Sequence, residues 1–126
     1  MNMGERNEMS ENIIMVNSNG LEWEDPPRGY YLTDVKQKVL WKDEETGAQW
    51  VLMKWPVGVL DKKHTHPEAN QYMFALEGEA ELPNGVKVPI KNLFTYTKKE
   101  LEHGETKLTK ESLVLFYWDG PSRPEF

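Results

Sequence analysis

The chain contains three histidines, and their positions suggest a metal site. His64 and His66 are separated by one residue, and side chains at positions i and i+2 of a strand point to the same face of a sheet. Two imidazoles on one face can bind one ion. His103, which lies 37 residues after His66, can supply a third ligand if an antiparallel strand returns beside the first. A histidine is more often a surface or hydrogen-bonded residue, so the spacing alone leaves both interpretations open.

The elements that would position these histidines are short strands separated by turns. Pro83-Asn84-Gly85 lies between two apolar runs, and Asn-Gly in that setting is a strong hairpin signal because both residues tolerate positive φ. No stretch of ten residues combines helical periodicity with helix caps. Short strands without intervening helices predict an antiparallel sandwich or barrel. The predicted strands cover residues 13–16, 38–41, 49–55, 71–82, 86–90, 93–97 and 112–118.

The length of 126 residues corresponds to one domain. Residues 1–12 are polar and are predicted to form a flexible N-terminal tail, followed by a single domain over 13–126. The net charge of −6 argues against binding to a phosphate backbone, and no clustered basic surface is expected. The chain has no cysteine, which excludes disulfides and thiolate ligands. No secretory or membrane-spanning apolar segment is evident, so a cytoplasmic location is expected.

The pattern around the first two histidines resembles the first motif of the cupin superfamily. The family pattern is G-x5-H-x-H-x3,4-E-x6-G, and this chain has Gly58, His64, His66, Gln71 and Gly78 at the fixed positions. The departure is Gln71, where the family usually has a glutamate ligand. An amide oxygen is a neutral ligand, so Gln71 is expected either to be a weak fourth ligand or to hydrogen-bond a water on the metal, and the second role is favoured.

The second cupin motif, G-x5-P-x-G-x2-H-x3-N, is similar to this chain mainly at His103. Asn92 replaces its first glycine, and asparagine tolerates left-handed backbone almost as glycine does. Lys98 and Glu100 replace the proline and second glycine, which leaves the geometry of that turn open, and Lys107 replaces the final asparagine.

The resemblance implies an all-β fold, the antiparallel double-stranded β-helix or jelly-roll barrel of cupins, with one divalent metal ion inside one end. His64, His66 and His103 would be the metal ligands, with motif residues between 58 and 103. Imidazoles suit Fe, Zn, Ni and Cu, and Fe(II) is favoured here over Zn, Ni or Mn. Three neutral ligands retain the full +2 charge, so an anionic or enolate ligand is expected.

A narrower likeness is to the three-histidine dioxygenases that cleave acetylacetone, and similar segments occur in the cupin domains of zinc-binding anti-sigma factors. The shared local features are Gln71-Tyr72, His103-Gly104-x-Thr106 and a last strand ending in Gly-Pro. If the residues of even number in the last strand point inward, they would wall the pocket. The expected pocket lining is therefore Tyr72, Thr106, Val114, Phe116 and Trp118.

The leading functional hypothesis is an Fe(II)-dependent oxygenase acting on a small enolisable, diketone-like substrate, with catalytic residues unknown. The alternatives are a non-oxidative metal-dependent lyase or isomerase, and a sensory module that binds metal or ligand without turnover. Asp61 and Glu68 flank the first two histidines and could transfer protons, although such loop carboxylates are usually only hydrated. The partners expected are a small molecule and a second copy of the chain, since apolar residues occupy both strand faces; no nucleic acid or membrane is expected.

Overall fold

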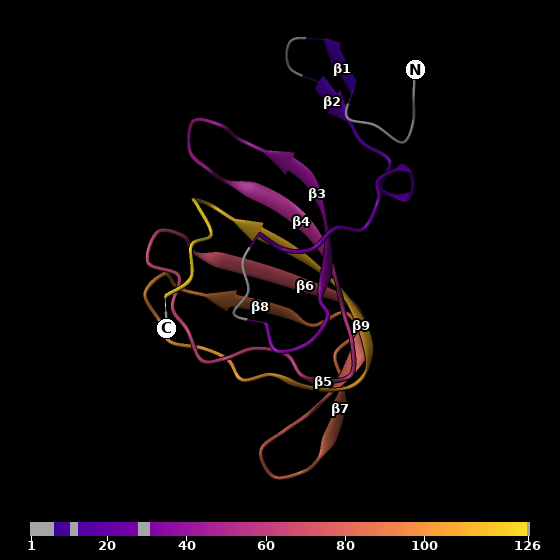
Figure 1. Ribbon diagram of the computed structural model, residues 1–126, viewed down its shortest axis with the longest axis vertical. Helices are drawn as coiled ribbons and strands as arrows, with labels where there is room; N and C mark the ends of the chain where they lie inside the picture. The colour runs from indigo at the N-terminus through magenta and orange to yellow at the C-terminus, as the bar shows by residue number, and fades with distance from the viewer. Residues whose placement is uncertain (1–6, 11–12, 28–30, 126) are drawn as a thin grey trace.

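The computed structural model describes residues 7–10, 13–27 and 31–125, which form strands and one short 3-10 helix. The described part contains no α-helix. Figure 1 shows one curved sheet with a small hairpin projecting from its upper end. The strands are β1 (Asn7–Ser10), β2 (Ile13–Met15), β3 (Lys36–Lys42), β4 (Gln49–Trp55), β5 (Gly58–Val59), β6 (Gln71–Glu81), β7 (Lys87–Pro89), β8 (Phe94–Thr97) and β9 (Lys107–Trp118).

The main sheet is antiparallel, in the order β3-β4-β9-β6-β7, with β8 also paired to β6 and β5 to β9 (Figure 1). Its strands alternate apolar and polar residues, so each can bury one face and expose the other. In β4, for example, Val51, Met53 and Trp55 are buried while the residues between them are more exposed. The expected all-β jelly-roll barrel is confirmed.

The two longest strands bend the sheet into a barrel. The first half of β6 pairs with β8 and its second half with β7, while β9 pairs with β6, β4 and β5 along its length. The register shifts between Ala75 and Ala80. Gly78 in this region has φ 141°, and a Cβ there would lie 2.1 Å from Ser112 Oγ. The glycine of the first motif therefore permits close contact between β6 and β9.

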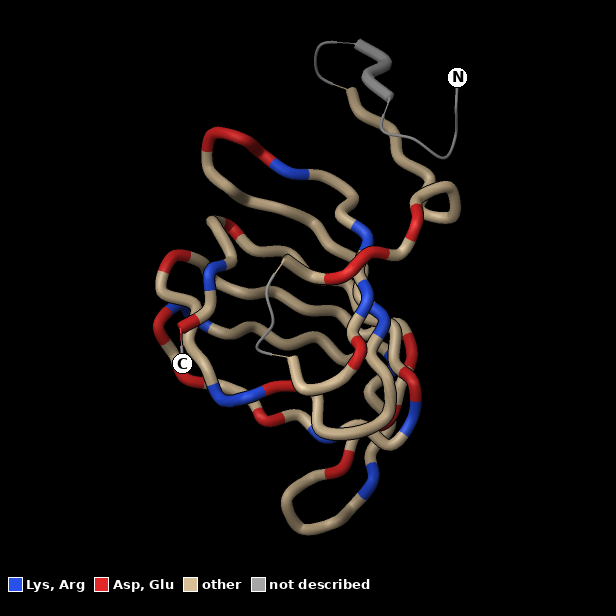
Figure 2. The backbone as a smooth tube through the Cα atoms, viewed as in Figure 1, with Lys and Arg blue, Asp and Glu red and all other residues tan. Residues whose placement is uncertain are grey.

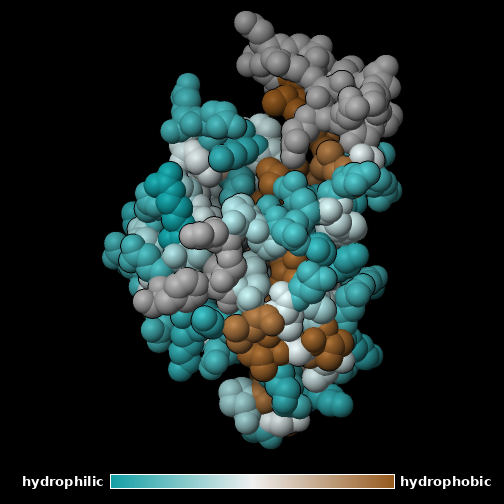
Figure 3. Space-filling view, in the orientation of Figure 1, coloured by the Kyte–Doolittle hydropathy of each residue, from teal (hydrophilic) through white to brown (hydrophobic). Residues whose placement is uncertain are grey.

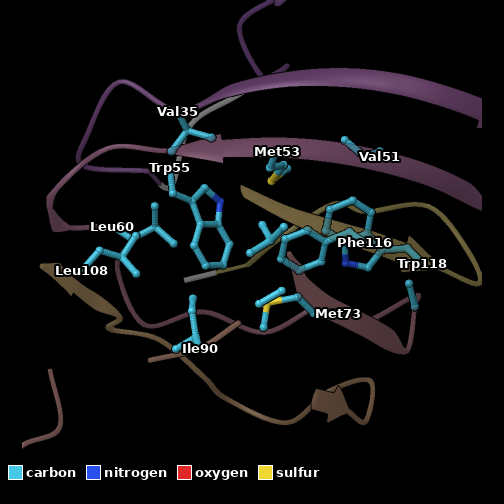
Figure 4. Close-up of a cluster of buried hydrophobic side chains, with 13 residues drawn as sticks. Val35, Val51, Met53, Trp55, Leu60, Met73, Ile90, Leu108, Phe116 and Trp118 are labelled. Atoms are coloured by element: carbon cyan, nitrogen blue, oxygen red, sulfur yellow. The ribbon is translucent and has the colours of Figure 1, made fainter. Parts of the chain in front are cut away.

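The hydrophobic core lies on the concave side of β4, β6 and β9 (Figure 4). Ser112, Val114, Phe116 and Trp118 are all buried, which confirms that the even-numbered residues of the last strand point inward. Phe116 and Trp118 stack with their ring centroids 4.8 Å apart. The remaining core residues are Val35, Val51, Met53, Trp55, Leu60, Ala69, Met73, Ala75, Ile90 and Leu108.

The predicted strands occur in the structure, with two differences. The last strand begins at Lys107, five residues before the predicted 112, and Gly58–Val59 was not predicted. These additions support each other, because Gly58 pairs with Leu108 and Val59 with Lys107.

The segment 1–12, expected to be a flexible tail, contains one strand among its described residues. Asn7–Ser10 is a strand that pairs with Ile13–Met15, which itself matches the predicted strand over 13–16. Residues 1–6 and 11–12 lie outside the described residues, so flexibility there stays a prediction.

Loops form the second wall of the barrel. The chain between β5 and β6 runs beside the chain between β8 and β9 in the lower part of Figure 1. An isolated bridge between His64 and His103 connects these two segments, and two more bridges join the chain between β5 and β6 to Tyr31, through Asp61, and to Glu125, through Thr65. A few point contacts therefore hold this wall, in contrast to the continuous ladders of the sheet.

Both turns of the second motif have the left-handed backbone that its glycines would supply. Asn92 has φ 68°, as expected for an asparagine replacing glycine. Glu100 has φ 70°, and the bond from Leu101 N–H to Lys98 O closes the turn around it. The turn geometry that Lys98 and Glu100 left open is thus maintained with a strained non-glycine residue.

The surface is mixed in character. Acidic and basic residues alternate along the loops in Figure 2, and the face seen in Figure 3 is mostly hydrophilic, with small apolar patches in the lower part of the view. None of the helices among the described residues is long and apolar enough to cross a membrane.

Candidate metal centre

The loop wall brings the three histidines together. His64 and His103 form an antiparallel pair in which each backbone N–H donates to the other's carbonyl at 2.9 Å. Such a pairing aligns the two Cα positions, and the two imidazole centroids lie 4.3 Å apart. His66 has its centroid 4.9 Å from His64 and 5.1 Å from His103.

The nitrogens of His64 and His66 are spaced as two ligands of one ion would be. One ligand nitrogen from each of the three histidines lies within 4.8 Å of the others, and His64 Nε2 is 3.2 Å from His66 Nε2. Two nitrogens each about 2.1 Å from one ion would be separated by about 3.0 Å at right angles and about 3.4 Å at the tetrahedral angle. The donor set of three imidazoles therefore fits a divalent transition metal.

Backbone carbonyls orient two of the imidazoles. His64 Nδ1 lies 2.6 Å from Lys62 O, and His103 Nδ1 lies 3.1 Å from Leu101 O. A carbonyl can only accept, so each Nδ1 carries the proton and each Nε2 keeps its lone pair. Both histidines use the carbonyl two residues earlier, which prepares their Nε2 atoms for a metal.

Burial keeps the imidazoles neutral. Burial, together with the neighbouring His64 and His103, lowers the pKa of His66 to about 3. Burial also lowers the pKa of His64, partly opposed by its hydrogen bond to Lys62. Neutral imidazole is the form that binds metal, so protons should compete with a metal only at lower pH than at an ordinary histidine site.

Ser122 is a neighbour of the site that the sequence did not indicate. Its hydroxyl lies 3.4 Å from His66 Nδ1, on the side of the ring opposite to His64. A proton on His66 Nδ1 would face this oxygen and leave Nε2 unprotonated for a metal. Ser122 follows the Gly-Pro end of the last strand, and serine at that place carries no recognisable signal.

Gln71 lies at the start of β6, where it pairs with Thr97 on one side and Trp118 on the other. Its side chain is buried, and its Oε1 accepts a hydrogen bond of 3.1 Å from the Trp118 indole. Trp118 in turn lies against His66, with centroids 6.1 Å apart. Trp118 thus contacts both the Gln71 amide and the imidazole of His66.

A cavity of about 190 Å³ adjoins the histidines. It is small, and its wall combines apolar side chains with polar groups such as those of Gln71, Thr97 and Thr106. The residues that line it are Tyr31, Trp55, Leu60, Asp61, His64, Gln71, Met73, Thr97, His103, Gly104, Thr106 and Phe116.

Two of the five residues expected to line the pocket, Thr106 and Phe116, line this cavity. Val114 lies deeper, fully buried between its partners Met53 and Ala75. The expectation for Tyr72 is corrected: its ring packs against Tyr96 and Tyr117 on the outer face of the sheet. Tyr72 follows the inward-pointing Gln71, and consecutive residues of a strand point to opposite faces.

A second, larger cavity has a volume of about 710 Å³, and Tyr31 lines both cavities. Trp118 and Ser122, which are both neighbours of His66, line this larger cavity. Two basic residues, Lys42 and Arg123, also line this cavity.

The two carboxylates flanking the histidines differ in position. Asp61 is buried, lines the smaller cavity and accepts the Thr106 N–H at 3.0 Å. Burial raises the pKa of the Asp61 carboxyl, opposed by the Thr106 hydrogen bond and by His64 and His103. Glu68 faces outward and pairs with Arg123 at 3.4 Å.

Asn70 connects three segments around the site, a role that the sequence did not indicate. Its backbone N–H and side-chain amide each donate to Asp119 at 2.8 Å, and its Oδ1 accepts the Lys99 N–H at 2.8 Å. These bonds fix the entry to β6 against the end of β9 and the start of the loop that carries His103.

Comparison with known proteins supports the cupin resemblance. The family model described as "ChrR Cupin-like domain" matches residues 11–123. A search of curated proteins gave no significant match.

Solved structures of low sequence identity share the fold. A protein proposed to be an acetylacetone dioxygenase from Methylibium petroleiphilum PM1 has a TM-score of 0.70 and 16% identity, with 97% of this chain and 90% of that chain covered. An acetylacetone dioxygenase from Acinetobacter johnsonii has a TM-score of 0.66 and 17% identity, covering 95% and 81%. The complex of SigE with the anti-sigma ChrR from Rhodobacter sphaeroides has a TM-score of 0.57 and 20% identity, covering 79% and 50%.

Proposed function

The chain belongs to the ChrR cupin-like domain family, and we propose on this premise that it binds one divalent metal ion through His64, His66 and His103. The observation that carries the proposal is the convergence of three imidazole nitrogens within 4.8 Å of one another. The carbonyls behind His64 and His103 and the burial of His66 support it, because they keep the Nε2 lone pairs available.

We further propose that the metal is Fe(II) and that the protein is an oxygenase acting on a small enolisable, diketone-like molecule. The similarity to two acetylacetone dioxygenase structures and the cavity of about 190 Å³ support this choice. A bound Fe(II) ion would supply redox chemistry and a positive charge that favours the enolate form of the substrate.

The chain's own residues would provide binding and exclusion of water. Trp55, Met73 and Phe116 form apolar walls that shield a bound molecule from solvent. Asp61, buried at the edge of the same cavity, is positioned to take a proton from a substrate that enolises. Its partner Thr106 N–H fixes one carboxylate oxygen and leaves the other for this role.

The test is oxygen consumption by protein loaded with Fe(II) without air and then given a panel of 1,3-diketones. Uptake that depends on substrate and is lost in His103→Ala would support the proposal. No uptake across the panel with fully loaded iron would contradict the oxygenase function while leaving metal binding intact.

A second candidate is a metal- or ligand-binding sensory module without turnover. It is favoured by the family description and by the similarity to the anti-sigma ChrR. Metal analysis of the protein as isolated separates the candidates, because stoichiometric zinc without substrate turnover favours the sensory module. A lyase or isomerase using Zn, Ni or Mn as a Lewis acid would instead show turnover without oxygen.

We also propose that two copies associate through the outer face of the sheet. Trp50, Tyr117, Tyr72 and Tyr96 are consecutive cross-strand partners on this face, with neighbouring centroids 4.9, 5.7 and 5.0 Å apart. Tyr96 and the nearby Phe94 remain at least half exposed in the single chain. Light scattering should show a dimer that Phe94→Glu dissociates, whereas Val57→Glu, at an exposed residue beside β5, should not.

A further inference from the structure

The side-chain amide of Gln71 is held in one orientation by Trp118. The indole Nε1 lies 3.1 Å from Gln71 Oε1, and both side chains are buried. An indole N–H can only donate, so the atom that faces it must be the amide oxygen.

The other end of this amide faces no hydrogen-bond acceptor in the described part of the chain. Among the described residues, none accepts a hydrogen bond from Gln71 Nε2. Gln71 lines the smaller cavity together with His64 and His103. Its backbone is fixed on both sides, since β6 pairs with β8 at Thr97 and with β9 at Trp118. The two N–H groups of this amide are therefore available to a ligand or a water molecule in the cavity.

We propose that Trp118 positions Gln71 as a hydrogen-bond donor to an oxygen atom of the ligand held beside the three histidines. The inference rests on the proposed metal-binding function and deepens it, because it specifies the ligand's chemistry. With its oxygen occupied by the indole, Gln71 contributes N–H groups to the cavity and no metal ligand. The site thus selects a small molecule bearing an acceptor oxygen near the metal, such as an enolate or a carboxylate.

The first test replaces the amide while keeping the length of the side chain. Gln71→Met has no donor, and the full-length protein loaded with Co(II) under nitrogen reports ligand binding through its visible absorption. Acetylacetone is the probe, and its Kd should rise roughly tenfold in Gln71→Met, the loss expected for one hydrogen bond to a charged oxygen. The affinity for Co(II) itself should change by less than about threefold.

The second test asks whether Trp118 acts through Gln71. Trp118→Phe removes the indole N–H and keeps an aromatic ring to stack on Phe116. The freed amide can turn its oxygen to the metal, so Co(II) should bind more tightly and acetylacetone more weakly. In the Gln71→Met background the same Trp118→Phe change should have little further effect on acetylacetone binding, because the residue it positions is gone.

A third readout needs neither activity nor a variant at Trp118. In Zn(II)-loaded protein labelled with ¹⁵N, the side-chain NH₂ signals of Gln71, identified by their absence in Gln71→Met, should shift when acetylacetone binds. The Trp118 indole signal should stay where it is, because its bond to Gln71 Oε1 persists.

The outcomes separate this inference from the proposed function. Unchanged acetylacetone affinity in Gln71→Met, equal effects of Trp118→Phe in the two backgrounds, or unmoved Gln71 NH₂ signals on ligand binding would overturn the inference while leaving metal binding standing. Failure to bind Co(II) at all would overturn both. Acetylacetone binding with the expected Gln71 effects, but no oxygen uptake with iron, would uphold the inference and contradict the oxygenase function.

Discussion

The two walls of this barrel are built differently. On one side, β4, β9 and β6 pair residue by residue over most of their length, and their inner side chains form the core. On the other side, the loops that carry His64 and His103 are joined by one isolated bridge and a few backbone hydrogen bonds. The first wall obtains its stability from burial spread over many residues, and the second depends on a few hydrogen bonds at chosen points.

This difference suggests that the two walls have different roles. A ligand site needs side chains held at set positions, and it also needs space that a packed sheet would fill. Point contacts satisfy both needs, because each bridge fixes one residue and leaves the neighbouring side chains free to line a cavity. Changes in the loop wall should therefore alter metal binding with little effect on folding, and changes in the sheet should do the reverse.

The largest effect expected is loss of metal affinity in His103→Ala. One of three ligands is removed, so affinity for Zn(II) or Co(II) should fall at least about 100-fold, the upper range for loss of a residue that only supports a ligand. The barrel should still fold, because alanine retains both backbone hydrogen bonds to His64. Competition titration with a chelating dye measures the affinity, with the exposed neighbour Glu102→Ala as control. Unchanged affinity would contradict the assignment of His103.

A strong effect on stability, with the site spared, is expected from Gly78→Ala in the sheet. The new Cβ would lie 2.1 Å from Ser112 Oγ and 2.6 Å from Ser112 Cβ, at a φ of 141° that alanine rarely adopts. The free energy of unfolding should fall by about 3 kcal/mol or more. Gly85→Ala is the matched control, since its φ is 85° and no atom lies within 4 Å of its added Cβ. Urea denaturation measures both variants, and in Gly85→Ala the free energy of unfolding should fall by only about 1 kcal/mol. Equal losses in the two variants would contradict the close-contact explanation.

A smaller effect is expected from pH on the metal-free protein. The folded-state pKa of His66 is lowered from 6.5 to about 3, so between these values the unfolded chain takes up a proton that the folded chain does not. The resulting stability is fully present above pH 6.5 and is lost as the pH falls, by up to about 1.4 kcal/mol per pH unit. Urea denaturation between pH 6.5 and 5 should show this slope, and His66→Gln should flatten it. A slope unaffected by His66→Gln would contradict the buried neutral imidazole.

The smallest effect expected is a gain in stability from Glu100→Gly. Glutamate at φ 70° is strained, and glycine adopts this backbone freely but loses more entropy on folding. The net gain should be positive and no more than about 1 kcal/mol. Thermal unfolding measures it, with Glu105→Gly in the same loop as control. A loss of stability in Glu100→Gly would show that its side chain contributes more than its backbone strain costs.

The sheet was largely predictable because burial of one face leaves a period of two in the sequence. Gln49–Trp55 has the predicted bounds, and the Pro83-Asn84-Gly85 hairpin connects the predicted partners. The early part of β9 was missed because Lys107–Glu111 is mostly polar and reads as a loop. Leu108, whose exposed fraction is 1%, is the one residue of this segment that indicates a strand.

The site was only partly predictable. The three histidines could be grouped because the family motifs specify their spacing. The even-numbered residues of β9 could be grouped because alternate residues of a strand point to the same face, so that placing one of them places the others. Ser122, Asn70 and the bond between Trp118 and Gln71 depend on contacts between segments 47 to 56 residues apart. Nothing local in the sequence encodes such pairings, since serine and asparagine at loop positions are usually only solvated.

The backbone pair between His64 and His103 has a consequence for the thermodynamics of metal uptake. In a chain without this pair, an ion joining the two imidazoles would have to close a loop of almost 40 residues, at an entropic cost of about 3 kcal/mol. Here the polypeptide closes that loop itself during folding, through two reciprocal hydrogen bonds of 2.9 Å. We therefore expect the folded protein to act as a preformed chelator, which would release and regain an ion without unfolding.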